Sequence, residues 1–354
     1  MPRDTISVPN PYFGSMILDC FLWAGPGERN LLLAKLNIEK NIVDQFFIAD
    51  CAYSFKGTYK GLTLKNIIQK DPVFHEFIPK ISIIETHDNP IKDFIEVYRG
   101  EVKVKYSIKN ELRHGVTMLI KRMSFQNLDE FKVFQREELA RRDNRIFRIV
   151  ENTQRESLRE RLLECAKEDD YIFISDIDEI LDGDTPDCAQ IIGDYIIDRK
   201  SPTMLHLQKR LRIWDFDNLN FSRQMTNPLV RASLVAASPY SLNTLRRMTS
   251  GYYVKHSKEL VHEYSSCQPY EELLKKYAWY PDLNSNTQDL DDAFNYNCEL
   301  VQDGKYRGWC EPVDPELDHQ PNWIRENIGW LKTRNVNANF WNKRREVFPD
   351  LFPT

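Results

Sequence analysis

The sequence has no excess of positive charge: 48 lysines and arginines stand against 53 aspartates and glutamates, a formal net charge of -5. Proteins that bind a nucleic-acid backbone usually carry a basic patch or stripe. The slight excess of acidic residues therefore excludes nucleic acid as an expected partner. Hydrophobic residues make up 42% of the chain and charged residues 29%. These fractions are typical of a globular protein and not of a disordered one.

The sequence also lacks a long apolar run. Its first such stretch, residues 16–24, is interrupted by Asp19, and the chain starts Met1-Pro2-Arg3 without the apolar core of a signal peptide. We therefore expect neither a leader nor a membrane anchor. The seven cysteines are odd in number and show no Cys-x-x-Cys spacing, which favours buried thiols in a reducing compartment.

Short apolar runs alternate with segments of helical spacing, such as Leu158, Leu162 and Ala166. This alternation predicts an α/β fold of the Rossmann-like kind with a mostly parallel central sheet. Ligands of such sheets bind at the carboxyl ends of the strands, so acids that end the runs are expected to meet in one polar site. The strand-like runs are residues 17–23, 43–49, 80–84, 171–175, 203–213 and 252–262, and the acids are Asp19, Asp50, Glu85 and Asp176.

The last part of the chain, residues 281–354, is rich in proline and holds four of the seven tryptophans. We interpret it as an extension packed on the main domain, which we place at residues 1–280. A helix is expected at residues 269–279, just before the boundary. No internal repeat or low-complexity tract is present.

Four Asp-x-Asp pairs occur, and only one of them directly follows an apolar strand. Alternate residues of an extended chain point the same way, so both carboxylates of that pair can face one ion. Hard oxygen ligands suit Mg²⁺ or Mn²⁺, which bind substrate phosphates alongside one or two carboxylates. The pair after the strand is Asp176 and Asp178; the others are Asp182/Asp184, Asp215/Asp217 and Asp289/Asp291.

The segment ISDIDEI at residues 174–180, preceded by a helix containing Gln154 and Arg155, resembles glycosyltransferase family 17. This is the family of the β-1,4-mannosyl-glycoprotein β-1,4-N-acetylglucosaminyltransferases. The similarity extends over residues 16–65 and 150–182. Further matching positions are Leu18 to Phe21, the helix from Glu28 to Leu36, and Asp50, Tyr53, Phe55, Gly57 and Lys60.

The resemblance implies a GT-A domain that binds a nucleotide sugar, with inversion at the anomeric carbon. The expected reaction moves a sugar, N-acetylglucosamine by resemblance, from a UDP-sugar to a hydroxyl of a glycan or glycoprotein acceptor. A Mn²⁺ or Mg²⁺ ion is expected as cofactor. Animal members reside in the Golgi and need an anchor, so this sequence favours a cytoplasmic bacterial or viral enzyme, with the Golgi lumen applying only if an anchor was trimmed.

Roles for individual residues follow from the resemblance and from residue chemistry. His262 echoes a family histidine, although Val261 stands where the family has tryptophan. The alternative for His262 and the arginines is a structural role, the arginines in a salt-bridged helix face. The expected metal ligands are Asp176, Asp178 and His262; the expected donor-binding residues are Asp50, Lys60, Arg155, Arg159 and Asp176; the candidate catalytic bases are Glu263, Asp215 and Asp217.

Three other functions fit parts of the pattern. A phosphatase of the haloacid-dehalogenase type also has Asp-x-Asp after an apolar strand, but it places the motif on its first strand. A calcium-binding module would need glycine at position 6 of an EF-hand-like loop, where this chain has Leu181. A catalytically inactive, sugar-binding member of the family stays open.

Overall fold

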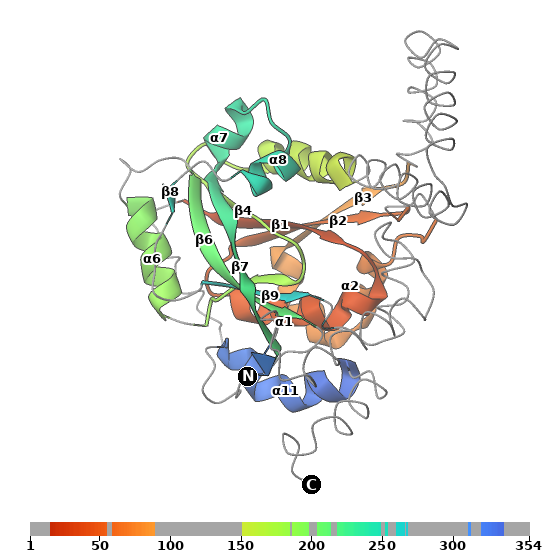
Figure 1. The fold of residues 1–354 in the computed structure, drawn as a ribbon. Helices are drawn as coiled ribbons and strands as arrows, with labels where there is room; N and C mark the ends of the chain where they lie inside the picture. Colours follow the sequence, from red (N-terminus) through yellow and green to blue (C-terminus); the bar gives the residue numbers. More distant parts are fainter. Residues whose placement is uncertain are drawn as a thin grey trace, which may run out of the picture.

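The structure is a computed structural model. It describes residues 15–54, 59–88, 151–184, 186–197, 204–213, 218–248, 252–253, 260–265, 267, 311–312 and 320–335. The fold is α/β with one mixed, curled sheet (Figure 1). The expectation of an α/β chain with a mostly parallel central sheet is confirmed.

Eight of the described strands follow one another across the sheet in the order β3-β2-β1-β4-β7-β6-β9-β5. Pairing is parallel from β3 through β4 and between β6 and β9; it is antiparallel where β7 and β5 join their neighbours. The strands are β1 Ile17–Trp23, β2 Gln45–Cys51, β3 Ile81–Thr86, β4 Tyr171–Ile174, β5 Glu179–Leu181, β6 Met204–Ile213, β7 Asn218–Arg231 and β9 Val261–Ser265, with β8 Tyr252–Tyr253 beside β6 and β10 Glu311–Pro312 beside β7.

Strand β1 shows why the central strands read as unbroken apolar runs. Its odd-numbered residues Ile17 and Phe21 belong to one buried cluster, and its even-numbered residues Leu18 and Cys20 belong to a second cluster. Successive side chains of a strand point to opposite faces, and both faces of this sheet are covered. Asp19 is the polar exception, in the middle of β1 and opposite Phe46 and Phe173, so the expectation that it ends a strand is wrong.

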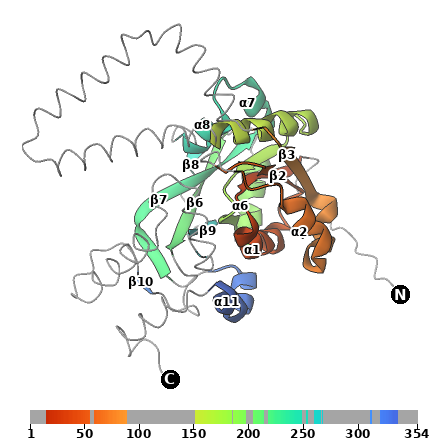
Figure 2. The ribbon, with the colours of Figure 1, turned by 90° about the vertical axis from the view of Figure 1, so that its right-hand side faces the viewer.

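Helices cover the two faces. Helices α1, α2 and α11 lie on one side of the sheet, and α7, α8 and the helical residues 151–165 lie on the other (Figures 1 and 2). The labelled helices have the bounds η1 Pro26–Glu28, α1 Arg29–Glu39, α2 Leu64–Lys70, η2 Pro72–Lys80, α6 Pro186–Ile197, α7 Ala232–Ala237, α8 Leu242–Arg247 and α11 Asn322–Asn335. None of the described helices is both long and apolar enough to cross a membrane.

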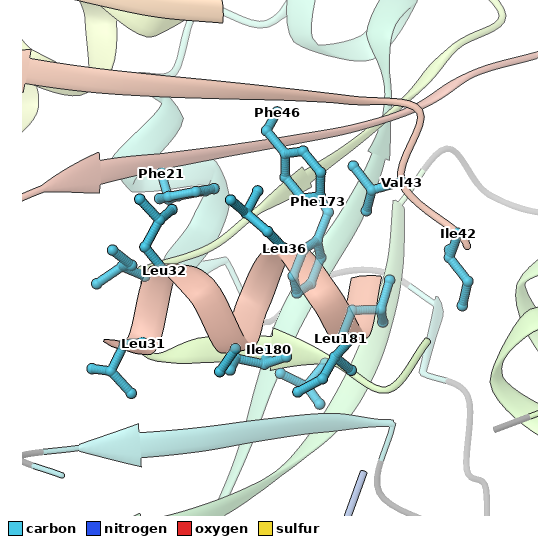
Figure 3. Packing of buried hydrophobic residues seen from close by; sticks show 14 of the residues in the cluster. Phe21, Leu31, Leu32, Leu36, Ile42, Val43, Phe46, Phe173, Ile180 and Leu181 are labelled. Atoms are coloured by element: carbon cyan, nitrogen blue, oxygen red, sulfur yellow. The ribbon is translucent and has the colours of Figure 1, made fainter. Parts of the chain in front are cut away.

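Helix α1 is enclosed by the curled sheet (Figure 3). Leu32 and Leu36 point toward Phe21 of β1 and its neighbours, while Ile180 and Leu181 of β5 lie on the opposite side of the helix. A helix that meets strands on two sides needs apolar residues around most of its circumference. The sequence of α1, RNLLLAKLNIE, meets this requirement.

Two predicted elements need correction or stay untested. The single strand expected at residues 252–262 is replaced by two short strands, β8 and β9, which both pair with β6. In the C-terminal segment, Ile324 and Leu331 of α11 join the buried cluster around α1. The domain boundary at residue 280 stays a prediction, and the helix expected at residues 269–279 lies outside the described residues.

Candidate functional site

The strand order reverses beside β1. The chain runs from β1 to β2 and β3 on one side and then places β4 on the other side of β1. Open α/β sheets bind ligands outside the carboxyl ends of the strands at such a point. Strand β4 ends there and leads into residues 175–179, which we call the acidic loop.

The acidic loop is a tight turn and not an extended chain. The amide of Glu179 donates to the carbonyl of Asp176 at 3.0 Å, and the amide of Asp176 donates to Oε2 of Glu179 at 2.8 Å. Strand alternation therefore does not align the two aspartates, and that reasoning from the sequence is wrong. A shared ion between Asp176 and Asp178 stays a prediction that depends on the turn.

Asp176 is fixed by two arginines from different elements. Arg155, in the helix over the sheet, donates to Oδ1, and Arg246, at the end of α8, donates to Oδ2. Burial acts to raise the pKa of the Asp176 carboxyl, but Arg246 and Arg155 outweigh it and lower the pKa below its ordinary value. The side chain keeps 36% of its surface exposed. Asp176 is thus an ionised carboxylate within reach of solvent.

Glu179 is the central acid of the site, and it is not among the residues predicted from the sequence. Its buried carboxylate accepts from Lys209 of β6 at 2.6 Å, from Arg246 at 2.7 Å and from the side-chain amide of Asn227. Burial opposes ionisation, yet Arg246 and Lys209 hold the pKa of Glu179 far below its usual range. The partners Lys209, Arg246 and Asn227 lie 30, 67 and 48 residues from Glu179 in the sequence, so no local pattern indicates this role.

Glu263 lies beside Glu179. The amide of its neighbour Tyr264 donates to the carbonyl of Asp178 at 2.7 Å, so β9 runs along the acidic loop. Lys209 pairs with both Glu179 and Glu263, and the Glu263 side chain is 13% exposed. Burial raises the pKa of the Glu263 carboxyl above its ordinary value; Glu179 adds to this shift and Lys209 opposes it.

The structure places His262 away from Glu263. The two residues are consecutive in β9 and so point to opposite faces of the strand. His262 is fully buried, with Nε2 3.3 Å from Oδ2 of Asp182. Within the described ranges, no three His, Cys, Asp or Glu side chains form a group that could hold a metal ion. The expected ligand set of Asp176, Asp178 and His262 is therefore not assembled in this arrangement.

Asp50 and Lys60 bind each other and not an open site. Oδ2 of Asp50 accepts from the amides of Thr63 and Leu64, at 2.7 and 2.8 Å, and Oδ1 lies 3.1 Å from Nζ of Lys60. Both amides belong to the start of α2, whose first N–H groups have no partner within the helix. Asp50 is fully buried, so the geometry gives this pair a role in the fold of the loop, and the expected contact with the donor stays a prediction.

The two predicted arginines of the helix at residues 151–165 diverge. Arg155 is 1% exposed and reaches the acidic loop, where it also donates to the carbonyl of Ser175 at 3.1 Å. Arg159 donates to the backbone carbonyls of Val235, Ser238 and Tyr240. Arg159 therefore joins α7 and the following turn to the helix, and its expected role in donor binding stays a prediction.

The replacement Asp50→Ala tests this structural assignment. We expect it to lower the free energy of unfolding by about 1–3 kcal/mol, since it leaves the amides of Thr63 and Leu64 without an acceptor. Urea unfolding measures the loss, with the exposed Asp88→Ala as the matched control. If the role is structural alone, the affinity of the folded variant for UDP with Mn²⁺ should stay unchanged, whereas a loss of that affinity at full stability would support the donor-binding role.

The remaining candidate bases, Asp215 and Asp217, lie outside the described residues. Comparison of the chain with models of known protein families and with curated proteins gives no match. Membership of glycosyltransferase family 17 therefore stays a prediction from the resemblance of the residues.

Proposed function

We propose that this chain is an inverting glycosyltransferase that moves a sugar from a UDP-sugar to a glycan hydroxyl, with a fold of the GT-A type. N-acetylglucosamine is the donor sugar that the family resemblance favours. The observation that carries the proposal is the position of the acidic loop. It follows a central parallel strand, at the carboxyl edge and beside the reversal of strand order, where nucleotides bind in open α/β sheets.

The charge around the loop supports a divalent cation as cofactor. An anionic diphosphate would meet no net positive charge from these side chains, so a cation is needed to balance it. Asp176 and Asp178 are the carboxylates that would hold Mn²⁺ or Mg²⁺, and two such ligands plus substrate phosphates are ordinary for these ions. The described cluster has four basic residues, Arg155, Lys209, Arg246 and Arg247, against five acidic ones, Glu151, Asp176, Asp178, Glu179 and Glu263.

When bound, that ion would supply positive charge to the diphosphate as it leaves. The chain's own groups have separate tasks. Arg155 and Arg246 keep Asp176 ionised and oriented, and Arg246 joins it to Glu179. Glu263, the described base candidate, is partly exposed and would accept the proton of the acceptor hydroxyl.

The phosphatase alternative finds less support. Its nucleophilic aspartate would lie on the first central strand, and the aspartate of β1 is Asp19, which is fully buried and paired with Lys35 at 2.8 Å. A buried carboxylate in an ion pair cannot attack a phosphate ester. Asp176, in contrast, is partly exposed but follows β4, the fourth of the described strands.

A thermal-shift experiment tests the proposed function. Wild-type protein is heated with UDP, GDP, UDP-N-acetylglucosamine, UDP-glucose or UDP-galactose, each with Mn²⁺ and with EDTA. A ligand at 100 times its dissociation constant adds about 2.7 kcal/mol of stability. We therefore expect a clear rise in Tm only when a UDP compound and Mn²⁺ are present together. Asp178→Asn should lose the rise, and the exposed Asp194→Asn should keep it. No shift of the wild type with any nucleotide would overturn the proposal.

A further inference from the structure

A lysine is buried in the middle of the apolar helix α1. Lys35 has no exposed surface, and its ammonium group lies near three oxygen acceptors: Oδ2 of Asp19 at 2.8 Å, Oε1 of Glu39 at 2.9 Å and the carbonyl of Glu179. An ammonium group has three N–H donors, so these partners match its full capacity. The charge also lies above the ring of Phe21, 5.0 Å from its centroid.

The side chains of Lys35, Asp19 and Glu39 also contact the acidic loop and strand β5. Oδ1 of Asp19 accepts from the hydroxyl of Ser175 at 2.7 Å, and Lys35 binds the carbonyl of Glu179. These are the first and last residues of the loop. Oε1 of Glu39 accepts from the amide of Leu181 in β5 at 2.7 Å, which fixes the strand that follows.

Stability alone does not account for such a cluster. Removing charges from water costs several kcal/mol per ion, and well-packed apolar residues often replace a buried ion pair without loss of stability. The surroundings here are apolar, with Phe21, Phe173, Ile180 and Leu181 in the same buried cluster. What apolar residues cannot do is bind the carbonyl of Glu179 and the hydroxyl of Ser175 at fixed positions.

We infer that Lys35, Asp19 and Glu39 form a positioning unit that fixes both ends of the acidic loop and thereby the separation of Asp176 and Asp178. The inference rests on the proposed function, because that separation matters only if the two carboxylates act together on a ligand. None of the three side chains reaches the surface, so the unit acts through the loop and not by contact with a substrate.

The unit is electrically neutral if one of its two acids keeps a proton. Burial, together with Asp19, raises the pKa of the Glu39 carboxyl well above its ordinary value, although Lys35 opposes the shift. Oε2 of Glu39 is buried and accepts no hydrogen bond from the described residues, which agrees with a proton on this carboxyl. Lys35 then balances the remaining negative charge.

This arrangement predicts how stability depends on pH. A folded-state pKa above the unfolded value stabilises the fold fully at pH values below the unfolded pKa, and that contribution is lost as pH rises through the folded pKa. The groups facing Glu39 are Lys35 on its own helix, Asp19 on β1, the amide of Leu181 on β5 and the buried thiol of Cys188 on α6. Glu39→Gln, which copies a protonated acid, should lack this component of the pH profile.

Hydrogen exchange followed by mass spectrometry tests the unit without any ligand. Lys35→Met should speed exchange of the amides of residues 176–181 by about tenfold or more, since the contacts of the Lys35 ammonium group with Glu179, Asp19 and Glu39 are lost. Ser175→Ala, which removes one link, should act in the same direction and less strongly, and it keeps the test valid if Lys35→Met fails to fold. Glu39→Gln and the exposed Lys65→Met should match wild type. Unchanged exchange in Ser175→Ala and Lys35→Met would overturn the inference.

Binding of Mn²⁺ with UDP, measured by calorimetry, provides the functional arm. Disturbing the groups that orient metal ligands typically weakens metal affinity about 10–100-fold, and we expect a loss of this size for Lys35→Met. Lys35→Arg, which keeps the charge, should lose less, and Glu39→Gln should bind like wild type. If wild type itself binds no Mn²⁺ and UDP, the proposed function fails while the exchange result still decides whether the unit orders the loop. If wild type binds and Lys35→Met binds equally well, the positioning role fails and the proposed function stands.

Discussion

Replacing Glu179 by methionine should lower the free energy of unfolding by about 3–5 kcal/mol, the usual loss when one partner of a buried ion pair is removed. The carboxylate of Glu179 is 1% exposed and receives hydrogen bonds from Lys209, Arg246 and Asn227. Lys209 would keep Glu263, and Arg246 would keep Asp176. Both cations would nevertheless lose an acid that no water molecule easily replaces in the buried interior.

Urea unfolding at neutral pH measures this effect. Glu164→Met, on an outward-facing helix position with 61% of the side chain exposed, is the matched control and should change stability by less than about 1 kcal/mol. Glu179→Gln keeps the shape of the side chain and should fall between the two. A Glu179→Met protein as stable as wild type would show that the cluster of charges around the acidic loop does not stabilise the fold.

Replacing Glu263 by glutamine should lower kcat by about 10²–10⁴-fold, the usual contribution of a general base. The side chain stays the same size, so the KM for the donor is expected to change little. The geometric basis is that Glu263 is partly exposed beside the acidic loop, while Lys209 joins it to Glu179 and limits its movement. Glu179 itself is too buried to meet an acceptor hydroxyl.

The assay is release of UDP from UDP-N-acetylglucosamine, with water or an added glycan as acceptor. Glu263→Asp should retain part of the activity, because a shorter carboxylate can still accept a proton. A Glu263→Gln protein with full kcat would exclude this residue as the base and leave Asp215 and Asp217 as the candidates. The effect is separate from that of Asp178→Asn, which should abolish the stabilisation by UDP and Mn²⁺.

The central strands could be predicted from the sequence because their signal is local. Strand β1 and strand β4 are short apolar runs next to helical segments, and each was found within one or two residues of its observed bounds. The position of the acidic loop could be predicted as well, because the loop begins directly after the last residue of β4. Asp19 was misplaced because a buried acid in mid-strand resembles a strand end when only the sequence is known.

The partners of the loop were beyond sequence reasoning because they come from distant parts of the chain. Arg246 lies 70 residues from Asp176, and Lys35 lies 144 residues from Glu179. No local pattern encodes such pairs; the register of the curled sheet brings them together. Lys35 offered one hint, since it interrupts the apolar run of α1 at a position that the helix buries.

The two strands that flank the acidic loop are completed at different times during synthesis. Strand β4 adds to β1, which has already left the ribosome, but β5 pairs with β9, which is made some 80 residues later at about 5–20 residues per second. Until residue 265 has emerged, β5 lacks this partner and Lys209 lacks Glu263. A nascent or prematurely released chain that lacks β9 therefore cannot form the complete acidic loop with its charged partners.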